Sequence, residues 1–499
     1  MSRPCLVLAA AALCVSCKPP PVPEAVPPAA DAKYSIPFSS DGDDEFGGDD
    51  DEFASDDEGL DNPVGAPPAD WMEQAAAKIT AHVQGKHRAW DRLAHIADHF
   101  GHRLSGSQSL EDTIDWIVGE MKKDGLDNPR REKVMVPKWV RGTEKLTIVS
   151  PRRRDVPMLG LGMSVGTKGT LRAEIAVVDH VDDIAKRGKD LAGKIVLINQ
   201  EMPPYDHERQ SSGYGEAVGA RTRGASEAAK VGAKAVLVRS VTAHSLSTPH
   251  TGSLSYDDGV AKIPAAAVTV EGAEYIARRV AAGDKVRVEL TMGAKLLGDV
   301  PSANVVAELT GREKPEEVVV IGGHIDSWDV GDGSTDDGAG CLMAWEAAVI
   351  LHELGLQPRR TIRVVLFTNE ENGLRGGKAY FDAHGTETHV GAIEADSGSG
   401  PPQGLGIASE DPNVIATLSA WGPLFEGLGA SDIGKGWGGA DISPLTKAGV
   451  LSLSMRPDGS RYFDLHHSPA DTIDKVDPTD LENNAAAMAL MAYLLAERP

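Results

Sequence analysis

The stretch "VVVIGGHIDSWDVGDGSTDDGAG", Val318 to Gly340, decides the fold. It opens with an apolar, β-branched run that is typical of a buried strand, and it then becomes rich in glycine. One histidine and five aspartates follow in the same stretch. The residues after it place Leu342, Trp345 and Val349 at helical spacing. The stretch therefore predicts a strand, a polar loop and a helix, with ligand-type side chains at the carboxyl end of the strand.

Two further apolar runs end in the same way. "IRVVLFTN", Ile362 to Asn369, leads into Glu370 and Glu371, and "HVGAIEA", His389 to Ala395, leads into Asp396. The connections between the runs have helical patterns, and helical crossovers imply parallel neighbouring strands. We therefore expect an α/β fold with a mixed, mostly parallel central sheet flanked by helices. The carboxyl ends of its parallel strands should share the edge at which ligands bind.

The residue types at this edge indicate a metal site. Imidazole together with carboxylates suits Zn²⁺ or a related divalent ion better than Ca²⁺ or Mg²⁺, which prefer oxygen ligands. His324 and Asp326 are two residues apart, so that one can bind the ion while the other supports the site and orients the imidazole through its second nitrogen. At the start of the helix, Asp336 or Asp337 can supply a further carboxylate. Each motif alone is a weak signal, but three at successive strand ends together predict a functional site.

The pattern of the sequence is different in the region before these strands. From about Ser150 to Lys295 it has short β-rich runs separated by glycine and proline. We predict an inserted, β-rich domain over residues 150–295. The catalytic domain would then be formed by residues 67–149 and 296–499, on either side of the insert.

The amino-terminal part predicts export. Residues 1–17 have one positive residue, a short apolar run and a "CVSC" ending, which indicate a lipoprotein-type signal peptide with the lipid on Cys17. Residues 18–66 are rich in proline and then in acids, which predicts a disordered tether. We expect an exported protein that is either held at the cell envelope, in the periplasm or on the outer surface, or secreted. This lipid would be its only membrane contact.

Composition excludes one class of partner. The formal net charge is −24, and nucleic-acid binding requires clustered lysine and arginine. After the leader only Cys341 remains, so that no disulfide within the mature chain is expected. A hydrophobic content of 41% is near the average for soluble globular proteins.

The chain resembles the M28 family of dinuclear zinc peptidases, and more narrowly its carboxypeptidase Q branch. Besides the metal motifs, the resemblance includes "RLSGS", "AAKVGAKAVLVRSV", "PHTG", "DGVAKIPAAAVTVE" and "FDLHHSPADTID", and it covers nearly the whole chain after the tether. It implies that the insert is a protease-associated domain.

The resemblance also assigns the site residues and two zinc ions per chain. It implies that Asp336 bridges the two ions, with Glu370 as the general base and Asp326 in a supporting position. The remaining ligands that it implies are His324 and Asp396 on one ion, and Glu371 and His467 on the other. His466 is the alternative to His467 as the imidazole ligand of the second ion, and the spacing to Asp471 favours His467.

The activity implied by the resemblance is that of an exopeptidase on dipeptides or short peptides, with a water between the metals as the nucleophile. The alternatives are a broader aminopeptidase of the same family, a single-zinc relative of glutaminyl cyclases, and a non-catalytic binding protein on the same fold. The resemblance also suggests a homodimer. Asn369 and Asp332 depart from the family pattern, which leaves the substrate preference open.

Overall fold

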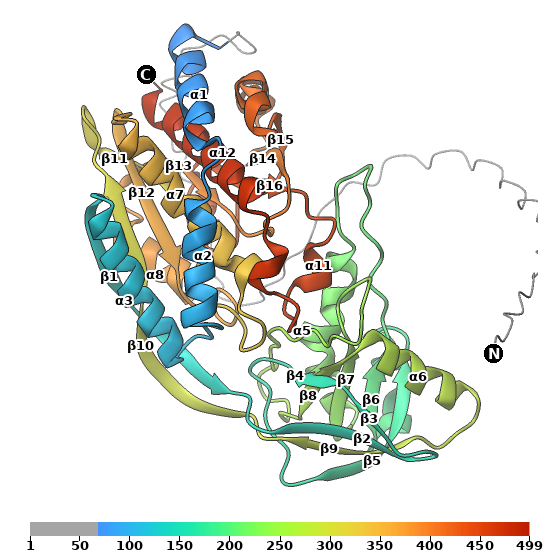
Figure 1. Ribbon diagram of the computed structural model, residues 1–499. Helices are drawn as coiled ribbons and strands as arrows, with labels where there is room; N and C mark the ends of the chain where they lie inside the picture. The colour runs from blue at the N-terminus through green and yellow to red at the C-terminus, as the bar shows by residue number, and fades with distance from the viewer. Residues whose placement is uncertain (1–67, 499) are drawn as a thin grey trace, which may run out of the picture. The chain divides into compact units, whose positions relative to one another are not determined.

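The computed structural model describes residues 68–498, and the predicted signal peptide, Cys17 and the tether lie outside this range. Two eight-stranded sheets form the framework (Figure 1). In spatial order the central sheet contains β1 (Asp127–Val140), β10 (Lys295–Leu309), β12 (Arg360–Phe367), β11 (Lys314–His324), β13 (Thr388–Glu394), β16 (Ser452–Pro457), β14 (Pro402–Ala408) and β15 (Asp432–Lys435).

The central sheet is mixed. Its middle strands β12, β11, β13 and β16 are parallel to one another, whereas β10 and β14 pair with them in the antiparallel sense. The predicted fold class, a mixed and mostly parallel sheet flanked by helices, is therefore confirmed. The three runs used to predict it are β11, β12 and β13, and β11 pairs in parallel with both of the others.

Alternation along the strands explains why both faces of this sheet are covered. In β11, Val319 and Ile321 belong to one buried cluster, and Val318 and Val320 belong to another on the opposite face. The helices on the first face are α1 (Asp70–Val83), α2 (Arg88–His99), α3 (Gln108–Lys123), α7 (Ala339–Glu353) and α12 (Pro478–Glu497). The helices on the second face are α8 (Arg375–His384) and α10 (Ser443–Lys447). In Figure 1, α1, α2 and α12 lie together on one side of the sheet.

The second sheet is built from residues between Glu144 and Met292. Its strands in spatial order are β3 (Arg154–Val156), β2 (Glu144–Ser150), β9 (Arg287–Met292), β5 (Leu171–Val178), β6 (Ile195–Ile198), β7 (Ala235–Arg239), β8 (Ala265–Val268) and β4 (Met158–Gly160). Its helices are α4 (Asp183–Arg187), α5 (Tyr214–Lys230) and α6 (Val270–Ala281). The chain leaves the central sheet at Val140 and returns at Lys295, which are paired residues of β1 and β10. The division into domains stays a prediction.

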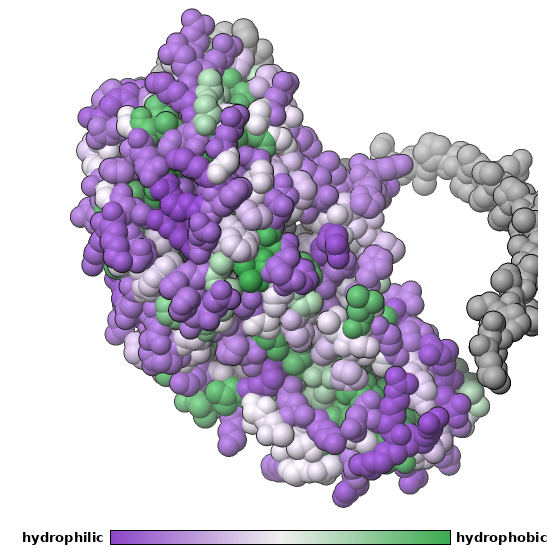
Figure 2. Space-filling view, in the orientation of Figure 1, coloured by the Kyte–Doolittle hydropathy of each residue, from purple (hydrophilic) through white to green (hydrophobic). Residues whose placement is uncertain are grey.

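Two further helical segments, α9 (Pro412–Ser419) and the 3₁₀ segment η3 (Gly422–Leu428), connect β14 to β15. The short helix α11 (Tyr462–Leu465) lies between β16 and α12. The face of the protein in Figure 2 is mostly hydrophilic, with small and separate apolar patches, as expected where the apolar sides of helices face inward. No helix between residues 68 and 498 is long and apolar enough to cross a membrane.

Candidate metal centre

The predicted site residues meet at the carboxyl ends of the parallel strands. His324 is the last residue of β11, Glu370 and Glu371 follow β12, and Asp396 follows β13. The parallel order of these strands brings residues that are far apart in the sequence to the same edge of the sheet.

One group of potential ligands contains His324, Asp336 and Asp396. The Nε2 atom of His324 lies 3.3 Å from Oδ1 of Asp336 and 3.6 Å from Oδ1 of Asp396. Ligand atoms of these three residues all lie within 4.8 Å of one another. An imidazole and two carboxylates at such distances can surround one divalent cation.

A second group contains His467 and Glu371 and shares Asp336 with the first. The Nε2 atom of His467 lies 3.3 Å from Oδ2 of Asp336 and 2.9 Å from Oε2 of Glu371. The two carboxylate oxygens of Asp336 therefore face two different imidazoles. This is the arrangement that a carboxylate shared by two cations requires.

His466 lies next to the same group. Its ring stacks on that of His467 with centroids 3.5 Å apart, and its Nε2 atom is 3.9 Å from Oδ2 of Asp336. Asp336, His466 and His467 also lie close enough together to hold an ion. We favour His467, because it is nearer to Asp336 and also contacts Glu371, and this choice stays a prediction.

The chemistry of the donors fits a metal. Oδ2 of Asp336 and Oε1 of Glu371 are buried and accept no hydrogen bond from any residue in the described part of the chain. Burial, and then the charge of Asp336, raise the pKa of Glu371 well above its usual range. Buried acceptors without a partner are costly, and a divalent cation would satisfy both oxygens. The mixture of imidazole and carboxylate ligands matches zinc.

Asp326 supports the site through two different parts of the residue. Its main-chain oxygen lies 2.9 Å from Nδ1 of His324 and accepts the Nδ1 hydrogen, which leaves Nε2 free for a cation. Its carboxylate accepts hydrogen bonds from Oγ of Ser105 at 2.9 Å and from the main-chain N of Glu370 at 3.0 Å. Asp326 thus orients His324 through its backbone and holds Glu370 through its side chain.

The structure separates the roles of the two neighbouring aspartates that the sequence left open. Asp337 accepts hydrogen bonds from the main-chain N atoms of His324 at 2.9 Å and of Gly340 at 3.1 Å. It therefore ties the end of β11 to the start of α7, whereas Asp336 faces both groups of ligands. The Asp471 carboxylate fixes the same loop by accepting from the main-chain N of Asp336 at 3.1 Å.

Residues of helix α5, which lies between β6 and β7 in the chain, also reach the centre, and sequence reasoning missed them. Nη1 of Arg221 in α5 lies 3.2 Å from Nδ1 of His467, and Nη2 of Arg221 donates to the hydroxyl of Tyr214 at 2.6 Å. The sequence contains one indication that the insert matters, because the run "AAKVGAKAVLVRSV" belongs to the family resemblance. This run does not include Arg221.

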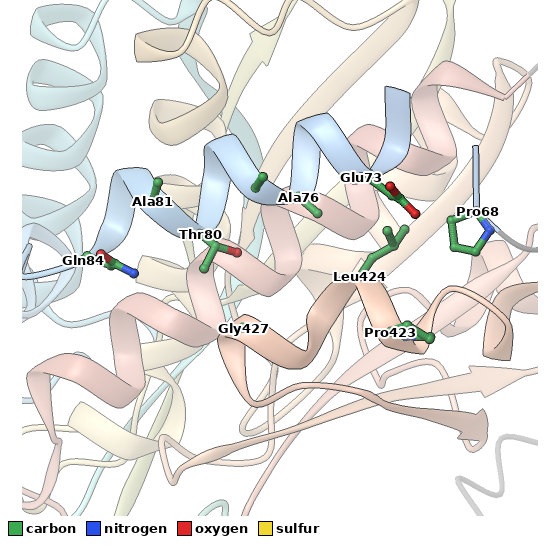
Figure 3. Close-up of a pocket in the computed structure, with 10 residues that line it drawn as sticks. Pro68, Glu73, Ala76, Thr80, Ala81, Gln84, Pro423, Leu424 and Gly427 are labelled. Carbon is green, nitrogen blue, oxygen red and sulfur yellow. The ribbon is translucent and has the colours of Figure 1, made fainter. Parts of the chain in front are cut away.

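A separate groove lies between α1 and η3 (Figure 3), and none of the proposed metal ligands lines it. Its lining includes Ala76, Thr80, Leu424 and Gly427, and Glu73 is its only acidic residue. Small side chains without a group of ligands do not form a metal site. The groups of possible metal ligands among residues 68–498 both lie at the edge of the central sheet.

Comparisons with known proteins identify the family that the chain resembles. Residues 304–492 match the model of peptidase family M28. The chain is 41% identical to carboxypeptidase Q of Mus musculus over 434 residues, which are 86% of this chain and 90% of the relative.

Solved structures give the same result for the fold. A peptidase M28 precursor from Shewanella amazonensis superimposes with a TM-score of 0.81 at 35% identity, covering 86% of this chain and 97% of that one. BSAP, a zinc aminopeptidase from Bacillus subtilis, has a TM-score of 0.61 at 20% identity, covering 82% and 95% of the two chains. At that identity the second likeness supports the fold alone.

Proposed function

The chain belongs to the M28 family of metallopeptidases and to its carboxypeptidase Q branch, and from that premise we propose that it hydrolyses dipeptides or short peptides with free ends. The reaction would use two zinc ions, one bound by His324 and Asp396 and the other by Glu371 and His467. The observation that carries the proposal is that Asp336 lies 3.3 Å from the Nε2 atoms of both histidines. When bound, the ions would polarise the scissile carbonyl and lower the pKa of a water molecule.

Glu370 is the proposed general base. It lies in the loop after β12, three residues beyond Phe367, and its main chain is held by the Asp326 carboxylate. Burial raises the pKa of Glu370 to about 8, and nearby cations would bring that pKa down toward neutrality. A base with a pKa near the working pH can take a proton from water and pass it to the departing amine.

Arg221 favours recognition of a free carboxyl terminus. The described part of the chain contains five buried arginines, and four of them are surrounded by carboxylates or main-chain oxygens. Arg221 makes no hydrogen bond or ion pair with either kind of group within residues 68–498, and its Nε atom is buried without an acceptor, as is that of Arg239. The five are Arg103, Arg221, Arg239, Arg360 and Arg363.

A substrate carboxylate would supply the missing partner. In a dipeptide the carboxylate carbon is three bonds from the scissile carbonyl carbon, and therefore less than about 4 Å away. Arg221 lies directly against His467, so that a carboxylate at this short distance from the reacting carbonyl is within its reach. A guanidinium binds a carboxylate through paired hydrogen bonds, and the Tyr214 hydroxyl can add a third.

The broader aminopeptidase and the binding protein remain as alternatives. A binding protein that had lost catalysis would be expected to lack ligands, but all five proposed ligand side chains lie together with Glu370 at one edge. The proposed inserted domain at residues 150–295, the homodimer, and export with a lipid on Cys17 extend the same proposal and rest on the sequence.

One experiment separates these functions. The purified protein is assayed on a dipeptide, on its amino-terminally blocked form and on its carboxyl-terminal amide, before and after chelation and zinc readdition. We expect hydrolysis that chelation abolishes and zinc restores, together with strong preference for the free carboxylate. Equal rates on acid and amide would favour the aminopeptidase, and absence of hydrolysis with zinc bound would favour the binding protein.

A further inference from the structure

The loop Pro249–Gly252 connects the second sheet to the histidine pair of the metal centre. The Nδ1 atom of His250 lies 2.7 Å from the main-chain oxygen of His466, which is 216 residues away in the sequence. The main-chain N of Thr251 donates to the main-chain oxygen of His467 at 2.9 Å. Consecutive carbonyls of the histidine pair are therefore held by consecutive residues of this loop.

The loop is itself fixed to the second sheet. Because the main-chain oxygen of His466 can only accept, the hydrogen of His250 must be on Nδ1. The main-chain N of His250 donates to Oγ of Ser240 at 2.9 Å, and this hydroxyl donates to the main-chain oxygen of Val268 at 2.8 Å. Val268 ends β8, so the hydrogen bonds run from the sheet through His250 to the histidine pair.

His467 needs such external support. Its φ angle is +60°, a left-handed conformation that costs a residue other than glycine about 1 to 2 kcal/mol. Strained conformations persist where surrounding contacts hold them in place. The hydrogen bond from Thr251 is made to the carbonyl of the strained residue itself, and the bond from His250 is made to the carbonyl before it.

Gly252 gives the ring of His467 its space. Its φ angle is +123°, and a Cβ atom at this position would lie 2.6 Å from Nδ1 of His467 and 2.4 Å from Nη1 of Arg221. Any other residue here would be strained and would also push against the imidazole. The loop therefore controls both the backbone and the side chain of His467.

We propose that Pro249–Gly252 is a positioning loop that holds His467 in the geometry for metal binding. The inference rests on the proposed dinuclear zinc function and extends it to the second sheet. The zinc position served by His467 then depends on a part of the chain that supplies none of the proposed metal ligands. The position served by His324 and Asp396 does not depend on it.

The first test compares two glycine variants in zinc binding. Gly252→Ala introduces both strain and contact with His467. Gly259→Ala introduces strain alone, because Gly259 has a φ angle of +75° and a Cβ atom added there would have no neighbour within 4 Å. Zinc content and affinity are measured by dialysis against a competing chelator, with circular dichroism to verify folding. We expect Gly252→Ala to bind one of its two zinc ions about 10 to 100 times more weakly, and Gly259→Ala to bind both normally.

The second test removes and restores the donor of His250. His250→Phe keeps an aromatic ring but cannot donate, and His250→Asn replaces Nδ1 by an amide nitrogen. We expect weaker binding of one zinc in the phenylalanine variant and recovery in the asparagine variant. If Gly252→Ala does not fold, the comparison of His250→Phe with His250→Asn still tests the positioning role of the loop.

The proposed function and the positioning role of the loop are contradicted by different results. If the wild-type protein binds no zinc, the proposed function is wrong. If the wild-type protein and folded Gly252→Ala and His250→Phe variants all bind two zinc ions with equal affinity, the positioning role is wrong.

Discussion

The main-chain N of Glu370 donates a hydrogen bond to Oδ1 of Asp326 at 3.0 Å, although 44 residues separate them. The same carboxylate accepts from Ser105 through its other oxygen. Asp326 follows β11 and Glu370 follows β12, which are paired strands, so this bond fixes the loop of the proposed base to its neighbour.

This relationship predicts the effect of Asp326→Ala. The variant should retain its fold and its zinc ligands but hold Glu370 less firmly, which lowers kcat about 10- to 100-fold. Steady-state kinetics on a dipeptide measure the change, with Ser105→Ala as the milder control, because it leaves the bond to Glu370 intact. An unchanged kcat in Asp326→Ala would remove the positioning role of this carboxylate.

Glu370→Gln tests the base itself. Glutamine keeps the size of the side chain but cannot accept the proton of the attacking water. We expect kcat to fall by about 10²- to 10⁴-fold while both zinc ions remain bound. Zinc analysis and peptide hydrolysis are measured on the same sample. Undiminished turnover would exclude Glu370 from this role.

Asp336→Asn tests the shared ligand. An amide has one oxygen where the carboxylate has two, and it carries no charge to offset two neighbouring cations. The zinc content of the variant should fall from two ions per chain to one or none, as measured by elemental analysis after dialysis. Two tightly bound zinc ions in this variant would contradict a bridging position for Asp336.

Local pattern was sufficient to predict the parallel strands β11, β12 and β13 and the ligand-type residues at their ends, whereas the role of each proposed ligand came from the family resemblance and stays a prediction. The apolar run Val318 to Ile321, the helical spacing after Gly340 and the ligand-type residues at each strand end can all be read from neighbouring residues in the sequence. Parallel pairing then forces those ends to one edge, and the distances between His324, Asp336 and Asp396 agree with this expectation.

The contributions of the second sheet could not be predicted in the same way. Arg221 and His250 are not at strand ends of the central sheet, and their places depend on how the two sheets pack. The bond between Asp326 and Glu370 likewise depends on the register of β11 against β12. The spacing to Asp471 favoured His467 over His466, and this choice stays a prediction, because spacing does not give the direction in which the backbone turns each of two adjacent side chains.

Arg221→Met should change the preference for a free carboxylate more than it changes the rate of peptide-bond hydrolysis. Methionine retains much of the length of the side chain but cannot bind a carboxylate. Loss of hydrogen bonds to a charged group should lower kcat/KM for dipeptides about 10- to 100-fold, with little effect on the matching amides. Binding of the dipeptide and its amide to the Glu370→Gln variant, with and without Arg221→Met, gives a second readout. Equal losses for acid and amide would contradict carboxylate recognition.

His384 predicts a pH dependence of stability that is independent of the metal centre. Its ring lies 3.0 Å from Oε2 of Glu132 and 2.7 Å from Oε1 of Glu387. The hydrogen bond with Glu132, and then that with Glu387, raise the pKa of His384 above its usual value, although burial opposes them. The folded protein therefore holds this proton more tightly than the unfolded chain does.

The sign of the effect follows from that difference. The stabilisation is fully present below the unfolded pKa of about 6.5 and is lost as the pH rises through the higher folded pKa. Thermal unfolding of wild type and His384→Asn should therefore differ more at about pH 6 than at a pH above the raised folded pKa, where the imidazole is neutral in both the folded and the unfolded chain. Since Glu132 is in β1 and His384 ends α8, the lost contact joins a strand to the helix that covers it. A difference in Tm that stays constant between the two pH values would show that the charged pair does not contribute.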